Sequence, residues 1–226
     1  MKSLLHSLIA LAVFVGAADA AYYDIGKNGE NKVNVSWESN ASLEMMVGRT
    51  NKATGFVYFD DAGKSHALLV TIPVRSMKTG IDARDEHMIG PDWLDAEKYP
   101  NIEFKSVAVK NKSGKPDQYE ITGDMTIHGK TRRITVTGSA RRFPARPTLE
   151  KMGYVGDIIQ LKTSFKIKLS DFGVIVPERL LGLKMADELS ISFDIFAFTN
   201  NDPGRKPEMP STRPAVAAPP ASQPAR

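Results

Sequence analysis

The sequence predicts an all-β protein, an antiparallel barrel of about eight strands with short helical insertions. Apolar and polar residues alternate with a period of two through most of residues 22–200, as in strands with one dry and one wet face. Short turn sequences separate consecutive strands. A meander of long one-faced strands removes its edges by closing into a barrel. A sandwich of two sheets fits the same pattern, so this alternation alone does not decide between a barrel and a sandwich.

Nine segments carry the strand pattern. The clearest is 159–169, in which Ile, Leu, Phe and Thr alternate with Gln, Lys and Ser. Turn chemistry at Lys112–Pro116 and at His128–Lys130 separates neighbouring long strands. In chain order the predicted strands are Val33–Trp37, Leu43–Gly48, Gly55–Asp60, Leu68–Val74, Ile102–Val109, Tyr119–Ile127, Ile134–Ser139, Ile159–Leu169 and Leu189–Ile195.

Two stretches break the alternation. Residues 79–99 mix charged and apolar side chains without a period of two, so we expect short helical turns that end at Tyr99-Pro100. Residues 177–186 fit one further helical turn. A long insertion in a barrel meander lies across one mouth or along the outer wall.

Both ends of the chain fall outside the predicted barrel, which spans 21–200. Residues 1–20 combine Lys2, an apolar run and Ala18-Asp19-Ala20, as in a signal peptide that is cleaved before Ala21. The apolar run covers about a dozen residues, whereas a membrane-spanning helix needs ~20. We therefore expect an exported protein, periplasmic or secreted. Residues 201–226 hold seven of the 14 prolines and predict a disordered tail, free or attached to a partner.

Composition excludes several classes of protein. The chain of 226 residues has no cysteine, so it has no disulfide scaffold, thiolate zinc site or cysteine nucleophile. Its net charge of +4 comes from scattered Lys and Arg rather than a basic patch, so we expect no nucleic-acid partner. No later segment is long and apolar enough for a transmembrane helix. The oligomeric state stays open, and a homodimer is compatible with the sequence.

Several sequence motifs closely resemble those of the YceI-like family and follow one another in the same order along the chain. They are Ser76–Gly80, Arg84–Met88, Trp93–Pro100, Ile102–Ser106, Tyr119–Thr131 and Ser170–Gly173. The resemblance spans most of 22–198 and implies a secreted or periplasmic lipocalin-like barrel that holds a long isoprenoid or other lipid, such as a polyprenyl-tailed quinone. It implies a carrier rather than an enzyme, with the lipid as ligand and no cofactor. One position departs from the family pattern, because many relatives have Arg where this chain has Leu169.

Eight large apolar side chains of the predicted strands form the candidate lining of a cavity. Unbranched Met suits a site that accepts a flexible chain. A filled core without a cavity is the alternative, and the resemblance favours a cavity. The predicted lining residues are Trp37, Met45, Phe56, Tyr58, Phe104, Met125, Phe165 and Phe193.

Polar candidates gather in the irregular stretch and in one turn. Asp85, His87 and His128 are candidate contacts to a ligand head group. Asp82, Asp85, Glu86 and His87 would also suit a divalent metal, but one local turn rarely supplies three converging ligands, so we expect no metal. An enzyme acting on an isoprenoid or quinone, using Asp85, His87 and His128, is one alternative function. An outer-membrane barrel is another, and it requires the apolar stripe to face outward.

Overall fold

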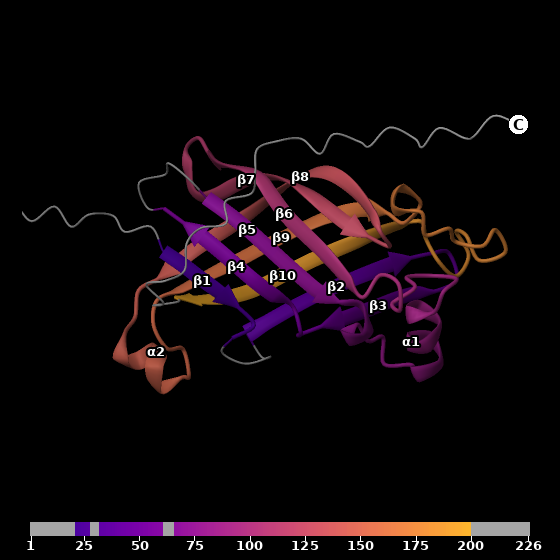
Figure 1. The fold of residues 1–226 in the computed structure, drawn as a ribbon, viewed down its shortest axis with the longest axis horizontal. Coiled ribbons are helices and arrows are strands. Elements are labelled where there is room, and N and C mark those ends of the chain that lie inside the picture. The colour runs from indigo at the N-terminus through magenta and orange to yellow at the C-terminus, as the bar shows by residue number, and fades with distance from the viewer. Residues whose placement is uncertain (1–20, 28–31, 61–65, 200–226) are drawn as a thin grey trace, which may run out of the picture.

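The computed structural model describes residues 21–27, 32–60 and 66–199. The predicted signal peptide (1–20) and tail (201–226) lie outside the described residues. The described chain is mostly β-structure, as Figure 1 shows. Its strands are β1 (Ala21–Ile25), β2 (Val33–Asn40), β3 (Met45–Thr50), β4 (Thr54–Phe59), β5 (His66–Pro73), β6 (Asn101–Lys112), β7 (Lys115–Ile127), β8 (Lys130–Phe143), β9 (Ile158–Lys168) and β10 (Glu188–Thr199).

The strands close into an antiparallel barrel of eight positions, which confirms the predicted fold class. The ring runs β1-β4-β5-β6-β7-β8-β9-β10, and β10 pairs back with β1. Every nearest neighbour along the chain from β4 to β10 pairs antiparallel. A closed ring leaves no free edge between β1 and β10, so the sandwich alternative does not apply.

Two positions of the ring are each occupied by two strands: β1 and β2 share the position beside β10, and β4 and β3 share the next position. β10 pairs with β1 through Ala197–Thr199 and with β2 through Leu189–Ile195. β3 pairs with β2 in the same way that β4 pairs with β1. β3 meets the next part of the wall at one backbone bridge, between Arg49 and Lys78. The nine predicted strands each overlap one of β2 to β10, and β1 is an additional strand that the sequence pattern did not predict.

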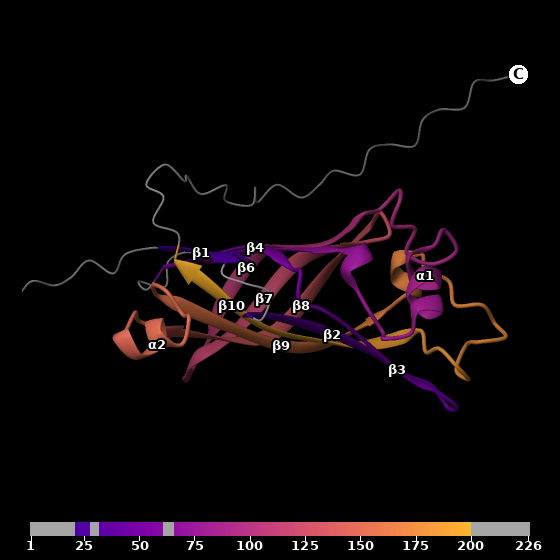
Figure 2. The same cartoon turned by 90° about the horizontal axis from the view of Figure 1, so that it is seen from below.

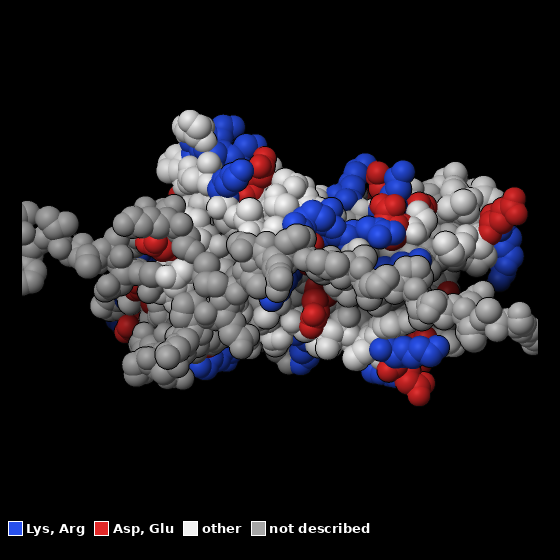
Figure 3. All heavy atoms as spheres, turned by 45° about the horizontal axis from the view of Figure 1, so that its top comes forward, with Lys and Arg blue, Asp and Glu red and all other residues white. Residues whose placement is uncertain are grey.

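The alternation in the strands sorts side chains between the two faces of the wall. Apolar side chains point inward and form one buried cluster. Charged side chains point outward and pair across neighbouring strands, as in Arg133–Asp124 and Lys166–Glu188. Figure 3 shows both signs of charge interspersed over the visible face. The apolar stripe therefore faces inward, contrary to the orientation that the outer-membrane alternative requires.

The helical insertions lie at the two ends of the barrel, as Figures 1 and 2 show together. Helix α1 (Asp82–Ile89) confirms helical turns in the predicted stretch 79–99. The short 3-10 helix η2 (Val74–Ser76), which precedes that stretch, belongs to the same end. The loop 174–187 follows η3 (Ser170–Phe172) at the same end. Helix α2 (Pro147–Lys151), not predicted, lies at the opposite end. None of the helices in the described ranges is long and apolar enough to cross a membrane.

Candidate functional site

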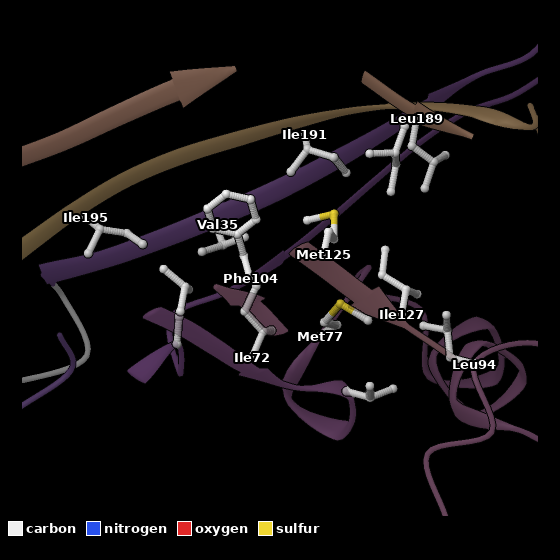
Figure 4. Packing of buried hydrophobic residues seen from close by; sticks show 14 of the residues in the cluster. Val35, Ile72, Met77, Leu94, Phe104, Met125, Ile127, Leu189, Ile191 and Ile195 are labelled. Atoms are coloured by element: carbon white, nitrogen blue, oxygen red, sulfur yellow. The ribbon is translucent and has the colours of Figure 1, made fainter. Parts of the chain in front are cut away.

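A cavity of about 910 Å³ lies inside the barrel, at the end that carries α1. Its walls come from inward-facing residues of β2, β5, β6, β7, β9 and β10. Figure 4 shows Ile191 of β10 and Val35 of β2 opposite Ile72 of β5 across the interior. The main apolar wall residues are Val35, Trp37, Ile72, Ile102, Met125, Ile127, Ile167, Leu169, Leu189, Ile191 and Phe193.

Two glycines make room for aromatic rings of the predicted lining. Gly48 of β3 lies directly opposite Trp37 of β2, and a Cβ atom at Gly48 would overlap the Trp37 ring. A Cβ atom at Gly123 of β7 would likewise overlap the ring of Phe104 from β6. A glycine directly opposite an aromatic residue, as at Gly48, or diagonal to one, as at Gly123, lets the ring lie flat over the neighbouring strand. These pairs hold Trp37 and Phe104 in place on the inner wall.

Methionine is unusually frequent around this cavity. Five of the nine methionines of the chain line it, and Figure 4 labels two of them, Met77 and Met125. A thioether side chain has three soft torsions and adapts to irregular partners. The lining can therefore follow a flexible chain more readily than a wall of branched residues. The five are Met46, Met77, Met88, Met125 and Met185.

An aromatic group closes the deep end of the cavity. Phe165 of β9 and Phe193 of β10 stack with ring centroids 6.0 Å apart. Behind them, on the side of Phe104, lies a second void of about 60 Å³. Phe193 and Met125 line both spaces. These two residues therefore form the partition between the cavity and the void.

The mouth is built from α1, the β2–β3 turn and the loop 174–187. Arg84 of α1 donates to Glu44 of the β2–β3 turn, with Nη2 and Oε1 3.0 Å apart. Both side chains line the cavity, so this ion pair crosses its edge. His87, Arg179 and Lys184 add further polar groups to the lining at this end. The cavity is thus apolar within and polar at its opening.

Asp85 anchors the segment that leads into α1. Its Oδ1 accepts hydrogen bonds from the backbone N–H of Thr79 at 2.8 Å and from the Thr79 hydroxyl at 2.7 Å. Lys78 Nζ lies 3.6 Å from the other carboxylate oxygen. Burial raises the pKa of Asp85, but the Thr79 hydrogen bonds and Lys78 outweigh it, so the pKa is lowered overall. Asp85 therefore holds the mouth in shape as a carboxylate.

The backbone of the same segment completes the wall beside β3. Arg49 and Lys78 exchange two backbone hydrogen bonds, each 2.9 Å long. The hydroxyls of Thr50 and Ser76 lie 2.8 Å apart. These contacts close the gap that β3 leaves in the ring on the side of β5. The mouth is therefore tied to the barrel on two sides.

The three predicted head-group contacts do not converge. His87 lines the cavity at its mouth. Asp85 is buried and directed to Thr79 rather than into the cavity. His128 lies in the β7–β8 hairpin with a positive φ of 50°, and its ring packs edge-on against Tyr99 at 4.8 Å. Within the described ranges, no three Asp, Glu or His side chains are placed to hold a metal ion.

The predicted apolar lining divides into three groups. Trp37, Met125 and Phe193 line the main cavity. Phe104 and Phe165 line the void behind the partition. Met45, Phe56 and Tyr58 line neither space, contrary to expectation.

The physical reasons differ for those three residues. Met45 is 63% exposed because the face that carries Leu43, Met45 and Val47 points outward, and Met46 on the opposite face points inward. Phe56 and Tyr58 lie on the outer face of β4, where both rings pack against Tyr22 of β1. β4 is apolar on both faces, so alternation does not identify its inner face.

Sequence reasoning missed several cavity residues. Trp93 and Leu94, which follow α1, and Leu180 and Met185, from the loop 174–187, line the cavity at the mouth. They lie outside the strands, so the period of two carries no signal for them. Leu169 is buried and adds an apolar surface to this cavity.

The chain matches known proteins over most of its length. A family described as YceI-like domain matches residues 27–197. The protein YceI of Escherichia coli O6:H1 is 31% identical over 175 residues, which cover 76% of this chain and 87% of the relative. A UPF0312 protein of Vibrio cholerae is 29% identical over 161 residues, which cover 70% of this chain and 80% of the relative.

Solved structures share the barrel. Burkholderia cenocepacia BcnA aligns with a TM-score of 0.63 and 29% identity, covering 74% of this chain and 98% of BcnA. A polyisoprenoid binding domain from Saccharophagus degradans aligns with a TM-score of 0.57 and 16% identity, covering 80% of this chain and all 100% of the domain. The second likeness concerns the fold alone. By the family match over residues 27–197, the chain belongs to the YceI-like family.

Proposed function

We propose that this protein is a carrier that holds a long isoprenoid-type lipid inside its barrel. The observation that supports this function best is the 910 Å³ cavity, apolar along its walls and polar at its mouth. Small-molecule sites occupy roughly 300–1,000 Å³, so this one lies at the upper end. A barrel of about eight strands is just wide enough to hold one such ligand.

The volume sets the length of chain that fits. At roughly 30 Å³ for each heavy atom, the volume of a water molecule in the liquid, the cavity of about 910 Å³ takes about 30 atoms. That number corresponds to roughly six isoprene units. A longer chain would leave its remaining units, or its head, at the mouth.

Apolar burial is sufficient to hold such a chain. Burying even ~20 methylene-like carbons contributes roughly 16 kcal/mol at ~0.8 kcal/mol each. Association and ordering remove several to more than ten kcal/mol of this. A net micromolar-to-nanomolar complex remains, which is tight enough to survive purification.

The polar rim is where the head group of the lipid lies in this proposal. His87, Arg179 and Lys184 offer donors, and Glu44 and Arg84 pair with each other beside them. A polyprenyl-tailed quinone is one such ligand, with its ring at the rim and its tail inside. The Saccharophagus degradans domain of the same fold is described as polyisoprenoid binding. With the expected signal peptide at 1–20, the proposed place of action is the periplasm.

Tryptophan fluorescence tests the proposal directly, because both tryptophans of the chain line the cavity. Trp37 belongs to the inner wall and Trp93 to the mouth. Titration with polyprenyl alcohols of increasing length should change the emission of the protein. We expect affinity to rise with each isoprene unit and to level off near roughly six units, where the cavity is full.

A chain-length series also provides the control. The variant Trp93→Phe leaves Trp37 as the probe of the wall, and Trp37→Phe leaves Trp93 as the probe of the mouth. Short alcohols that reach only the inner wall should change the fluorescence emission of Trp37 more than that of Trp93. Affinity that does not depend on chain length, with both signals unchanged, would contradict the proposal.

A further inference from the structure

The exposed apolar side chains of this protein gather around the mouth of the cavity. Among the described residues, nine large apolar side chains are exposed, and seven of them belong to segments at the mouth end. The other two, Met152 and Val155, follow α2 at the opposite end of the barrel (Figures 1 and 2). The seven are Leu43, Met45, Val47, Ile81, Ile175, Leu181 and Leu183.

Four of these side chains project from one ordered structure, which we name the apolar tip: Leu43, Met45, Leu181 and Leu183. The β2–β3 turn and the loop 174–187 are joined there by backbone hydrogen bonds. Ser42 N–H donates to the Gly182 carbonyl at 2.9 Å, and Leu43 N–H donates to the Leu183 carbonyl at 2.9 Å. Leu43 is nevertheless 74% exposed. Paired backbone groups lower the cost of placing this tip in an apolar medium.

The apolar tip lies next to the mouth of the cavity. In the β2–β3 turn and at the start of β3, Glu44 and Met46 line the cavity while Leu43 and Met45 face solvent. In the loop 174–187, Leu180 and Met185 line the cavity while Leu181 and Leu183 face solvent. Exposed and cavity-lining side chains therefore follow one another along both segments, so the apolar tip lies directly beside the mouth of the cavity.

Charge beside the tip fits the surface of a phospholipid bilayer. Arg179 and Lys184 are exposed on the loop that carries Leu181 and Leu183. The carboxylate of Glu44 pairs with Arg84 at 3.0 Å, and Asp187 of the loop accepts hydrogen bonds from Ser170. Glu178 is exposed on the same loop, and Glu86 and Asp92 line the mouth on the side of α1. Apolar side chains flanked by Lys and Arg are the pattern of segments that lie in the interface between head groups and acyl chains.

We propose that the apolar tip docks the mouth of the barrel on a phospholipid membrane. Leu43, Leu181 and Leu183 enter the interface, and Arg179 and Lys184 contact lipid phosphates. A chain can then pass between the bilayer and the cavity at the docked mouth, with its head group among the polar side chains of the rim. This last step rests on the proposed carrier function, whereas the docking itself does not.

Vesicle flotation tests the docking with the full chain. The probes are vesicles of phosphatidylcholine alone and of phosphatidylcholine mixed with anionic phosphatidylglycerol. The test variant is the double change Leu43→Asp and Leu183→Asp, and the matched control is Met152→Asp and Val155→Asp at the other end of the barrel. We expect the native protein and the control to float, more strongly with anionic vesicles. The bound fraction of the tip variant should fall at least tenfold.

Three further readouts separate the alternatives. Melting curves establish that both variants fold, which is expected because all four positions are exposed. Light scattering after gel filtration reports the assembly state, and a dimer that the tip variant alone converts to monomer, without vesicle binding, would overturn the proposal. Native mass spectrometry reports bound lipid. Flotation without lipid would contradict the carrier function only, and bound lipid without flotation would contradict the docking only.

Discussion

Filling the cavity by one substitution is the sharpest perturbation of the proposed carrier. Ile191 of β10 lines the cavity and lies opposite Trp37 of β2 in the sheet register. Replacing it by tryptophan adds bulk on the inner face of the wall. The matched control is Ser192→Trp, one residue further on, because Ser192 is exposed on the outer face beside Ser164.

The magnitude follows from the volume. Ile191→Trp adds about six heavy atoms, which at roughly 30 Å³ each occupy up to about 180 Å³ of the 910 Å³. The cavity then loses space for about one isoprene unit. About six methylene-like contacts at ~0.8 kcal/mol amount to roughly 5 kcal/mol of gross burial. If only about 1.4 kcal/mol of this reaches the net binding energy, the Kd of a long chain rises tenfold.

The assay compares polyprenyl alcohols of several lengths on the two variants and the native chain. Chains that fill the cavity should bind Ile191→Trp at least tenfold more weakly, and short chains should bind it nearly as well as before. Ser192→Trp should behave as the native protein. The free energy of unfolding, measured in urea, should change by less than the 1–3 kcal/mol that overpacking a filled core costs. Unchanged affinity for long chains, or a stability loss of that size, would refute the cavity argument.

Three further predictions concern the anchors and the partition. Asp85→Ala should lower the free energy of unfolding by about 1–3 kcal/mol, because the half-buried Thr79 donors lose their buried acceptor. Asp85→Asn keeps an acceptor oxygen, and an equal loss of stability in urea would argue against this role. The ion pair with Arg142 and the hydrogen bond from the Ala145 N–H lower the pKa of Asp157. The stabilisation that the Asp157 carboxylate gives to the folded state is therefore complete above its ordinary pKa near 3.8 and is lost as the pH falls through the lower pKa of the folded state. Below about pH 4, the melting temperature of Asp157→Asn should therefore fall less steeply with pH than that of the native protein. Parallel curves for the two proteins would contradict this role of Asp157. Phe193→Ala should join the cavity to the 60 Å³ void, so native mass spectra should show longer bound chains, and an unchanged distribution would show that the partition does not limit length.

The barrel was predictable from the sequence because its signal is local. In a strand with one dry face, apolar residues recur at every second position, and β7, β8, β9 and β10 keep this alternation over many residues. Trp37, Met125 and Phe193 reach the cavity for this reason. The prediction failed where alternation did not identify the inner face of a strand. In β3 the inward side chain is Met46 rather than Met45, and β4 has apolar residues on both faces.

The mouth was not predictable from the sequence because its contacts are not local. Glu44 and Arg84 are 40 residues apart, and the Ser42–Gly182 contact spans 140 residues. No short motif encodes such pairs, and they form only after the barrel brings α1, the β2–β3 turn and the loop 174–187 to one end. Asp85 illustrates the same limit, since its sequence neighbours indicate a polar cluster but not that it faces Thr79.

Native mass spectrometry of protein purified without detergent is the most direct test of whether the barrel holds a lipid. A denaturing spectrum of the same sample and an organic extract identify what leaves the protein on unfolding. We expect one bound lipid per barrel, with a polyprenyl-type chain of at least roughly six isoprene units. A protein that carries no lipid, and that takes up no polyprenyl chain when one is supplied, would contradict it.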